Sequence, residues 1–336
     1  MVKWHAWMIL CLSLLVISCE QWVVSPDPES NPEVVFEYLW KEVNERYAFF
    51  EEKNLDWDRV GEEYRSKISQ DMGQLELFEL LADMLFELRD GHVNLTNSFN
   101  RSRNWEWFEE YPVNYNENII QKNYLGKDYW ASGPLLNQEL GEVLYVNYRS
   151  FSQGIAEGNL QALMIRAQNK KGLIIDVRNN GGGSLRNAEK LASCFVEEDT
   201  EYASQRIKNG PGKNDFGPWE SMSYSPKEGL KYTGPVVVLI NRRSYSASTF
   251  FAQMMKVLPN VILVGDQTGG GGGTPAFGEL PNGWSYRFSV TQTIDTDGKQ
   301  LEGGVEPTIK AEIGRQAEIN GQDSIIDGAV IFLENL

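Results

Sequence analysis

Hydrophobic and polar positions in the first part of the chain repeat with the period of an α-helix. Residues 31–33 (Asn-Pro-Glu) have the features of a helix start: an N-cap, a proline at the first helical position and an acid in the first turn. The apolar spacing predicts two further helices at about 56–68 and 74–88. Gly91 suits a C-cap position with a positive φ. We therefore predict an N-terminal helical subdomain over residues 31–95.

From residue 141 onward the pattern changes to short apolar runs that alternate with helical segments. We predict buried strands at 143–148, 172–177, 235–241 and 261–264, with helices between them and a C-terminal helix at 323–333. Strands that alternate with helices require crossovers, which indicates an α/β fold with a largely parallel sheet. Residues 141–336 are predicted to form this core, and residues 96–140, rich in Trp, Tyr and Asn, an irregular connection of strands and loops.

The N-terminus has the pattern of an export signal. Lys3 precedes an apolar run at 8–17 that is too short to span a bilayer comfortably. The run ends in Leu15-Val-Ile-Ser-Cys19, which resembles a bacterial lipobox, whose cysteine is lipidated after cleavage. We expect a lipoprotein signal peptide at 1–18, a flexible tether at 19–30 and a lipid anchor at Cys19. The expected location is the bacterial cell envelope, periplasmic or outer-membrane; a plain signal peptide or short anchor helix is the alternative.

Composition excludes several classes of partner and chemistry. The net charge of −16 repels phosphate backbones, so we expect no nucleic-acid partner. Cys194 is the only cysteine of the expected folded part, which leaves no intrachain disulfide there, and it is predicted to be a buried, unreactive thiol. His92 is the only histidine of the mature chain, so any mechanism that needs an imidazole must use it. Without a His/Cys ligand cluster we expect no metal and no cofactor.

Three glycines follow a predicted buried strand, in the segment 176–184 (Asp-Val-Arg-Asn-Asn-Gly-Gly-Gly-Ser). Glycines allow the backbone N–H groups to turn toward a ligand, and the helix that follows adds a positive end. The segment predicts an oxyanion hole with donors from Gly182 or Gly183. A tight strand-to-helix turn is the alternative, and a dinucleotide site is disfavoured because G-x-G-x-x-G is absent.

Two further positions carry candidate chemistry. Ser246 lies where a strand turns sharply into a helix, so it is either an N-cap or a nucleophile, with the Ala247 N–H directed into the oxyanion site. Glu302 precedes two glycines, so it is either a buried orienting acid or a solvated loop acid.

Four segments together resemble the conserved blocks of the tail-specific, C-terminal-processing serine peptidase family (S41): residues 88–93, 173–183, 241–249 and 303–307. Their order and spacing are also similar. The resemblance implies a crotonase-like ββα core and assigns the nucleophile to the middle serine of the Ser-x-Ser-x-Ser run, Ser246.

Two departures narrow the resemblance to one branch. Residues 96–140 are too few to hold the PDZ domain of many members. Glycine stands where the bacterial and chloroplast processing enzymes have a lysine base, in the segment 265–271. The tricorn-core branch instead implies a Ser–His–Glu arrangement of Ser246, His92 and Glu302. Gly91 stands where that branch has a further serine.

The predicted function is therefore a serine-type endopeptidase, similar to carboxyl-terminal-processing peptidases, that acts on peptides or proteins. His92 would take the Ser246 proton, and Glu302 would orient the ring. The residues predicted to bind a carboxylate of the substrate are Arg178, Arg242 and Arg243. The alternative is a non-catalytic protein on the same fold that binds hydrophobic ligands or peptides; a His92 ring directed into the core would favour it.

Overall fold

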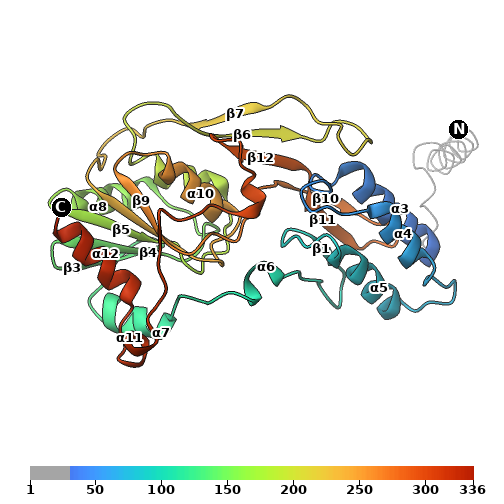
Figure 1. Cartoon of the computed structure of the whole chain (residues 1–336), viewed down its shortest axis with the longest axis horizontal. Coiled ribbons are helices and arrows are strands. Elements are labelled where there is room, and N and C mark those ends of the chain that lie inside the picture. Colours follow the sequence, from blue (N-terminus) through green and yellow to red (C-terminus); the bar gives the residue numbers. More distant parts are fainter. Residues whose placement is uncertain (1–30) are drawn as a thin grey trace, which may run out of the picture.

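The computed structural model describes residues 31–336, and a seven-stranded sheet organises the larger part of them (Figure 1). The strand order is β13-β9-β8-β5-β4-β3-β2. The pairs from β13 to β4 are parallel, whereas β3 and β2 add antiparallel strands at one edge. The strands are β2 Trp130–Ser132, β3 Leu135–Leu140, β4 Val143–Tyr148, β5 Gly172–Asp176, β8 Val236–Ile240, β9 Val261–Gly265 and β13 Ile309–Lys310. The predicted α/β fold with a largely parallel sheet is confirmed.

Helices cover both faces of this sheet, which explains why its central strands are apolar without interruption. In β5, Leu173 and Ile175 belong to a core shared with α8, α9 and α10, whereas Ile174 belongs to a core shared with α12. Successive strand residues point to opposite faces, so a strand buried on both sides needs apolar residues throughout. The helices are α8 Glu157–Ala167, α9 Leu185–Ala192, α10 Ala247–Lys256 and α12 Ser324–Glu334.

Three helices at the other end of the molecule form a second core (Figure 1). They are α3 Pro32–Arg46, α4 Trp57–Arg65 and α5 Gln74–Phe86. Asn31 caps α3 as predicted, since its side-chain oxygen accepts the Val34 N–H at 3.0 Å. The helices pack on a sheet of order β1-β11-β10, made of β1 Asn94–Thr96, β10 Pro275–Glu279 and β11 Ser285–Ser289. Late residues such as Phe288 thus complete the core of the N-terminal helices; the domain limits predicted from the sequence stay predictions.

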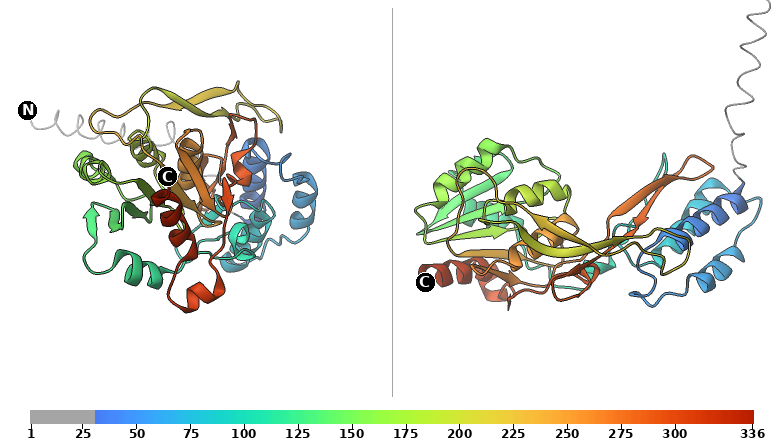
Figure 2. Two further views of the ribbon diagram at one scale, coloured as in Figure 1. Left: turned by 60° about the vertical axis from the view of Figure 1, so that its left-hand side comes forward. Right: turned by 90° about the horizontal axis from the view of Figure 1, so that it is seen from above.

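A third sheet, of order β12-β6-β7, runs between the two ends (Figure 2). Its strands are β6 Thr200–Ile207, β7 Glu220–Tyr224 and β12 Thr291–Asp295. Residues 284–293 are divided between β11 and β12, which belong to different sheets. From β12, Gln292 donates to the Ala48 carbonyl at 2.7 Å and so ties this sheet to the helical end.

The connection between the two ends is more helical than predicted. Besides β2 and β3, residues 96–140 contain α6 Glu106–Glu109, α7 Glu117–Ile119 and a π-helical turn, η1 Ile120–Leu125. The remaining elements are η2 Leu301–Gly303 and α11 Arg315–Ile319. No helix within residues 31–336 is long and apolar enough to cross a membrane. The predicted signal peptide, the tether at 19–30 and Cys19 lie outside the described residues.

Candidate active site

The structure brings Ser246 and His92 together from two distant elements. Ser246 lies in the turn between β8 and α10, and His92 lies between α5 and β1. The imidazole Nε2 is 2.9 Å from the Ser246 Oγ, which is hydrogen-bond distance. His92 is buried, yet its ring is directed at this hydroxyl and lines the same pocket. The geometry is that of a nucleophile and its base, and it argues against the alternative in which the ring is directed into the core.

The backbone of Ser246 adopts a conformation that few residues with a side chain occupy. Its φ is 56° and its ψ is −120°. The Ser246 N–H donates to the Gly270 carbonyl at 2.9 Å, which holds the turn in place. Although Ser246 is the N-cap residue of α10, its side chain makes no capping hydrogen bond. The strained turn therefore presents the hydroxyl to His92 and not to the helix.

The glycine loop packs directly against this turn. A side chain at Gly182 would lie 2.5 Å from the Tyr245 carbonyl oxygen and 2.9 Å from the Ala247 nitrogen, so only glycine fits there. The Gly182 N–H, however, donates to the Asn180 side chain at 3.0 Å. Gly182 was predicted as an oxyanion donor, and in this structure its N–H is already occupied. The backbone donors left from the prediction are those of Gly183 and Ala247.

Gly91 is required for a reason different from the predicted one. The helix α5 ends at Phe86, and the residue with positive φ beyond it is Arg89 (47°), so the predicted C-cap role of Gly91 is wrong. A Cβ on Gly91 would instead lie 2.4 Å from the Trp107 Nε1 and 2.9 Å from the Tyr245 hydroxyl. Two aromatic side chains thus fill the space that a side chain beside His92 would need.

Burial keeps the imidazole neutral. Burial lowers the pKa of His92 from 6.5 to about 4. The negative charge of Asp90 raises this pKa, but its effect is smaller than that of burial. The nearby backbone of Gly273 also raises the pKa of the ring. The buried Nδ1 of His92 nevertheless makes no hydrogen bond within residues 31–336. An unprotonated ring is the form that can accept a proton from Ser246.

Glu302 is buried as one of the sequence hypotheses required, but it makes no hydrogen bond to His92. Its Oε1 accepts from Lys53 Nζ at 2.9 Å and its Oε2 accepts the Gly272 N–H at 3.1 Å. Burial raises the pKa of Glu302 to about 7, and the Lys53 charge opposes this. Lys53 also donates to the Arg89 carbonyl at 2.8 Å. Glu302 is thus linked through Lys53 to the loop that carries His92.

Asp90 is a buried carboxylate beside His92 that was not predicted as a site residue. Its Oδ1 accepts the His92 backbone N–H at 2.7 Å, and its Oδ2 accepts from the hydroxyls of Ser289 (3.0 Å) and Tyr47 (3.2 Å). Burial opposes ionisation, but the charges of Lys53 and His92 and these hydrogen bonds hold the pKa of Asp90 below its usual value. A sequence signal was present, since Asp90 precedes His92 by only two residues.

Arg178 was predicted as a substrate-binding candidate, and the structure contradicts this. Its side chain is fully buried and pairs with Asp176 at 2.7 Å and with Asp323 at 2.9 Å, and it donates to the Asn114 carbonyl. A guanidinium that is buried between two carboxylates is not available to a ligand. Its role is to join β5 to the start of α12.

The other two predicted arginines also lie outside the pocket that contains Ser246. Arg242 pairs with Asp266 at 3.0 Å and lies 3.9 Å from the centre of the Tyr111 ring. Arg243 lies 4.6 Å from the centre of the Phe108 ring. The sequence showed the two arginines in this turn. It could not show that Arg242 pairs with Asp266 and that both guanidinium groups lie against aromatic rings.

The pocket at Ser246 has a volume of about 590 Å³. Besides Ser246, His92 and the three glycines, its wall includes residues that sequence reasoning did not assign: Trp105, Trp107, Tyr245, Phe277 and Arg287. Trp107 stacks on Tyr245 at 4.2 Å between ring centres, and Tyr245 lies 5.0 Å from the imidazole. The aromatic segment 96–140 therefore contributes part of the cleft.

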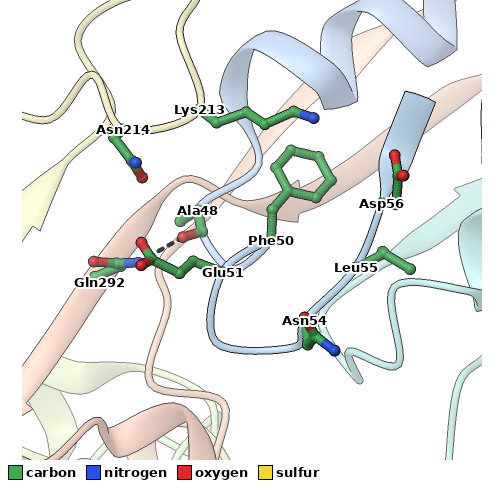
Figure 3. A pocket seen from close by; sticks show the side chains of 9 residues that line it. All are labelled: Ala48, Phe50, Glu51, Asn54, Leu55, Asp56, Lys213, Asn214 and Gln292. Atoms are coloured by element: carbon green, nitrogen blue, oxygen red, sulfur yellow. Dashed lines mark hydrogen bonds between the residues drawn. The ribbon is translucent and has the colours of Figure 1, made fainter. Parts of the chain in front are cut away.

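A separate cavity of about 480 Å³ lies between the helical end and β12 (Figure 3). Phe50, Leu55 and Gln292 line it together with Lys213, which pairs with Asp58 at 2.9 Å. It shares no lining residue with the pocket at Ser246 and contains neither serine, histidine nor cysteine.

Cys194 is buried as predicted, and burial raises the pKa of its thiol to about 12, so it is unreactive at neutral pH. In the part of the chain that the structure describes, no group of three or more His, Cys, Asp or Glu side chains is arranged to hold a metal ion.

Fold and site together define a class: an α/β protein with a serine–histidine pair and a glycine-rich loop, the arrangement of serine hydrolases. The comparisons identify the family. Residues 142–311 match peptidase family S41, and residues 28–86 match the tricorn protease C1 domain. The chain belongs to peptidase family S41.

Individual relatives agree with this assignment. A solved structure of a candidate peptidase from Parabacteroides merdae is 42% identical, with a TM-score of 0.86, and the match covers 91% of this chain and 97% of that one. Mature CPAF complexed with lactacystin has the same fold at 12% identity (TM-score 0.67, 91% and 97% covered). The carboxy-terminal processing protease CtpA of Bacillus subtilis is 27% identical over 54% of this chain, but the match covers only 37% of CtpA.

Proposed function

We propose that this chain is a serine endopeptidase that resembles carboxyl-terminal-processing peptidases and hydrolyses peptide bonds with Ser246 as nucleophile and His92 as general base. The single observation that carries the proposal is the 2.9 Å separation of the His92 Nε2 and the Ser246 Oγ within a pocket. Membership of family S41 supports the substrate class. A serine nucleophile and its base are sufficient chemical groups for acyl transfer.

In the proposed reaction, His92 takes the hydroxyl proton of Ser246 as the oxygen attacks the peptide carbonyl. The negative charge that develops on the carbonyl oxygen is met by the backbone N–H groups of Gly183 and Ala247. Ala247 is the first residue of α10, where N–H groups have no partner within the helix and the helix dipole is positive. His92 then protonates the leaving amine, and water hydrolyses the acyl-enzyme.

We assign Glu302 a positioning role in place of direct contact with the ring. Lys53 bridges it to the Arg89 carbonyl, three residues before His92, so that Glu302 orders the loop that carries the base. The imidazolium formed during the reaction is stabilised by Asp90, whose charge already raises the pKa of the ring. The Ser–His–Glu arrangement of the proposal therefore acts through Lys53 as an intermediate group.

The proposal includes the finer features implied by the family resemblance. We propose that the sheet and its helices form a crotonase-like ββα core and that residues 31–95 form a helical subdomain placed beside it. We also propose that the chain is a lipoprotein held at the bacterial cell envelope through Cys19. Mass spectrometry of a membrane fraction would test the last point, since loss of residues 1–18 and an acylated Cys19 are expected.

Labelling with a serine-directed phosphonate tests the nucleophile. The wild type is expected to gain one label at Ser246, and Ser246→Ala to gain none while it unfolds at an unchanged denaturant concentration. Ser221→Ala, at an exposed serine of β7, is the matched control and keeps the label. Labelling that persists at another serine in Ser246→Ala would reject the proposed nucleophile. A library of quenched fluorescent peptides then identifies the bonds that the wild type cleaves and His92→Ala does not.

A further inference from the structure

Arg287 lies in the wall of the pocket that contains Ser246. It comes from β11, where it is partly buried. The Nε donates to the His92 carbonyl at 2.8 Å, which fixes the plane of the guanidinium. Within residues 31–336, no carboxylate forms an ion pair with it, and its two terminal nitrogens have no protein acceptor. These nitrogens are the pair that commonly binds a carboxylate by two parallel hydrogen bonds.

A second arginine lies close to Arg287. Asn94 is its partner across β1 and β11, and Arg101 donates to the Asn94 side chain at 2.6 Å, which places a second guanidinium nearby. Burial and the charge of Arg101 lower the pKa of Arg287. Asp90 attracts Arg287, but its oxygens bind His92, Ser289 and Tyr47. Neither Arg287 nor Arg101 therefore forms an ion pair within residues 31–336.

The position of Arg287 relative to the reacting groups fixes where its ligand would lie. Arg287 bonds the backbone of His92, and it shares the pocket with Ser246. Across the hairpin, its register partner is Phe277, whose side chain is 71% exposed. The strands β10 and β11 thus form one wall of the pocket, with an apolar and a cationic side chain next to each other. A peptide that lies along this wall presents one of its side chains or its terminus to Arg287.

We propose that Arg287, assisted by the charge of Arg101, binds a carboxylate of the peptide substrate near the scissile bond. This inference rests on the proposed peptidase function and names a chemical preference of the same site. The carboxylate belongs either to an Asp or Glu side chain or to the free C-terminus of the substrate. Both present the same planar anion, so the geometry of the guanidinium suits both, and the experiment separates them.

The test uses matched peptides and the full mature chain. One set places Glu or Gln at each position near the bond that the wild type cleaves, and a second set carries a free or an amidated C-terminus. The wild type is expected to prefer the carboxylate form in one of the two sets. Arg287→Gln is expected to lower kcat/KM for that form by about 10- to 100-fold, mainly through KM. It is expected to lower kcat/KM for the neutral form by a smaller factor, because the hydrogen bond to the His92 carbonyl is also lost.

Two further variants separate charge recognition from structural damage. Arg101→Gln does not touch His92 and is expected to lower the same preference by about threefold. Arg287→Lys keeps the charge but loses the two parallel hydrogen bonds, so an intermediate preference is expected. Arg59→Gln, at an exposed arginine of α4, is the matched control and retains the wild-type preference.

The outcomes distinguish this inference from the proposed function. If Ser246 is labelled by the phosphonate and neutral peptides are cleaved, but no carboxylate preference exists, Arg287 does not read a substrate anion and the inference is overturned. The inference is also overturned if the preference survives in Arg287→Gln. It is overturned as well if Arg287→Gln and Arg101→Gln lower kcat/KM equally for all peptides. Absence of both labelling and cleavage in the wild type would instead overturn the proposed function.

Discussion

The lowered pKa of His92 predicts an unusual dependence of both activity and stability on pH. Burial holds the pKa of the folded imidazole at about 4, whereas an exposed histidine titrates near 6.5. Because the neutral ring is the base, kcat/KM is expected to stay high as the pH falls through 6 and 5. The acid limb assigned to this group is expected near pH 4.

The same difference determines the effect on folding. Between pH 6.5 and about 4, the unfolded chain binds a proton at His92 that the folded chain does not bind. The unfolding free energy must therefore fall as the pH falls through this window. The gap between the two pKa values corresponds to a loss of roughly 3 kcal/mol by pH 4, which is a large part of the stability of an ordinary domain. In His92→Gln this contribution is absent, so its stability is expected to approach and then exceed that of the wild type as the pH is lowered.

The assay is a titration of the imidazole Cε1–H resonance by NMR, which is simple because the chain has two histidines. His92→Gln assigns the resonance, and urea unfolding of both proteins between pH 7 and 4 measures the stability difference. A His92 resonance that titrates at 6.5 or above would refute the reasoning, because the ring would then be no less protonated than in the unfolded chain. A stability difference that does not change with pH would refute it equally.

Three other substitutions probe the site. Asp90→Asn is expected to lower kcat by about 10- to 100-fold and to lower the pKa of His92 further. Glu302→Gln is expected to lower kcat less than tenfold, because Glu302 reaches the His92 loop only through Lys53. Profiles of kcat and kcat/KM against pH measure both effects. Ser246→Gly is expected to be more stable than Ser246→Ala by about 1 kcal/mol in urea unfolding, because glycine relieves the positive φ, and both variants are inactive. Gly91→Ala is expected to cost about 1–3 kcal/mol, since its Cβ would overlap an indole ring; an unchanged midpoint would contradict that packing.

Local patterns were sufficient for several elements, whereas the pairing of Ser246 with His92 was implied by the resemblance to the peptidase family. The N-cap at Asn31, the apolar run of β5 and the start of α10 one residue after Ser246 all depend on residues a few positions apart, and the structure has them where the sequence predicted them. His92 followed from composition, since it was the only histidine left after the expected signal. Such features are readable from the sequence because propensity, periodicity and capping act over one or two turns.

The partners of the charged groups were decided only by the folded chain. Lys53 and Glu302 are 249 positions apart, and His92 and Arg287 are 195 apart, so no local pattern shows that they meet. Arg178 and Arg287 are equally polar in the sequence, but one is enclosed between two carboxylates and the other faces the pocket at Ser246. Whether a charge is compensated depends on which distant segments pack around it, and that arrangement is set by the burial of the cores as a whole.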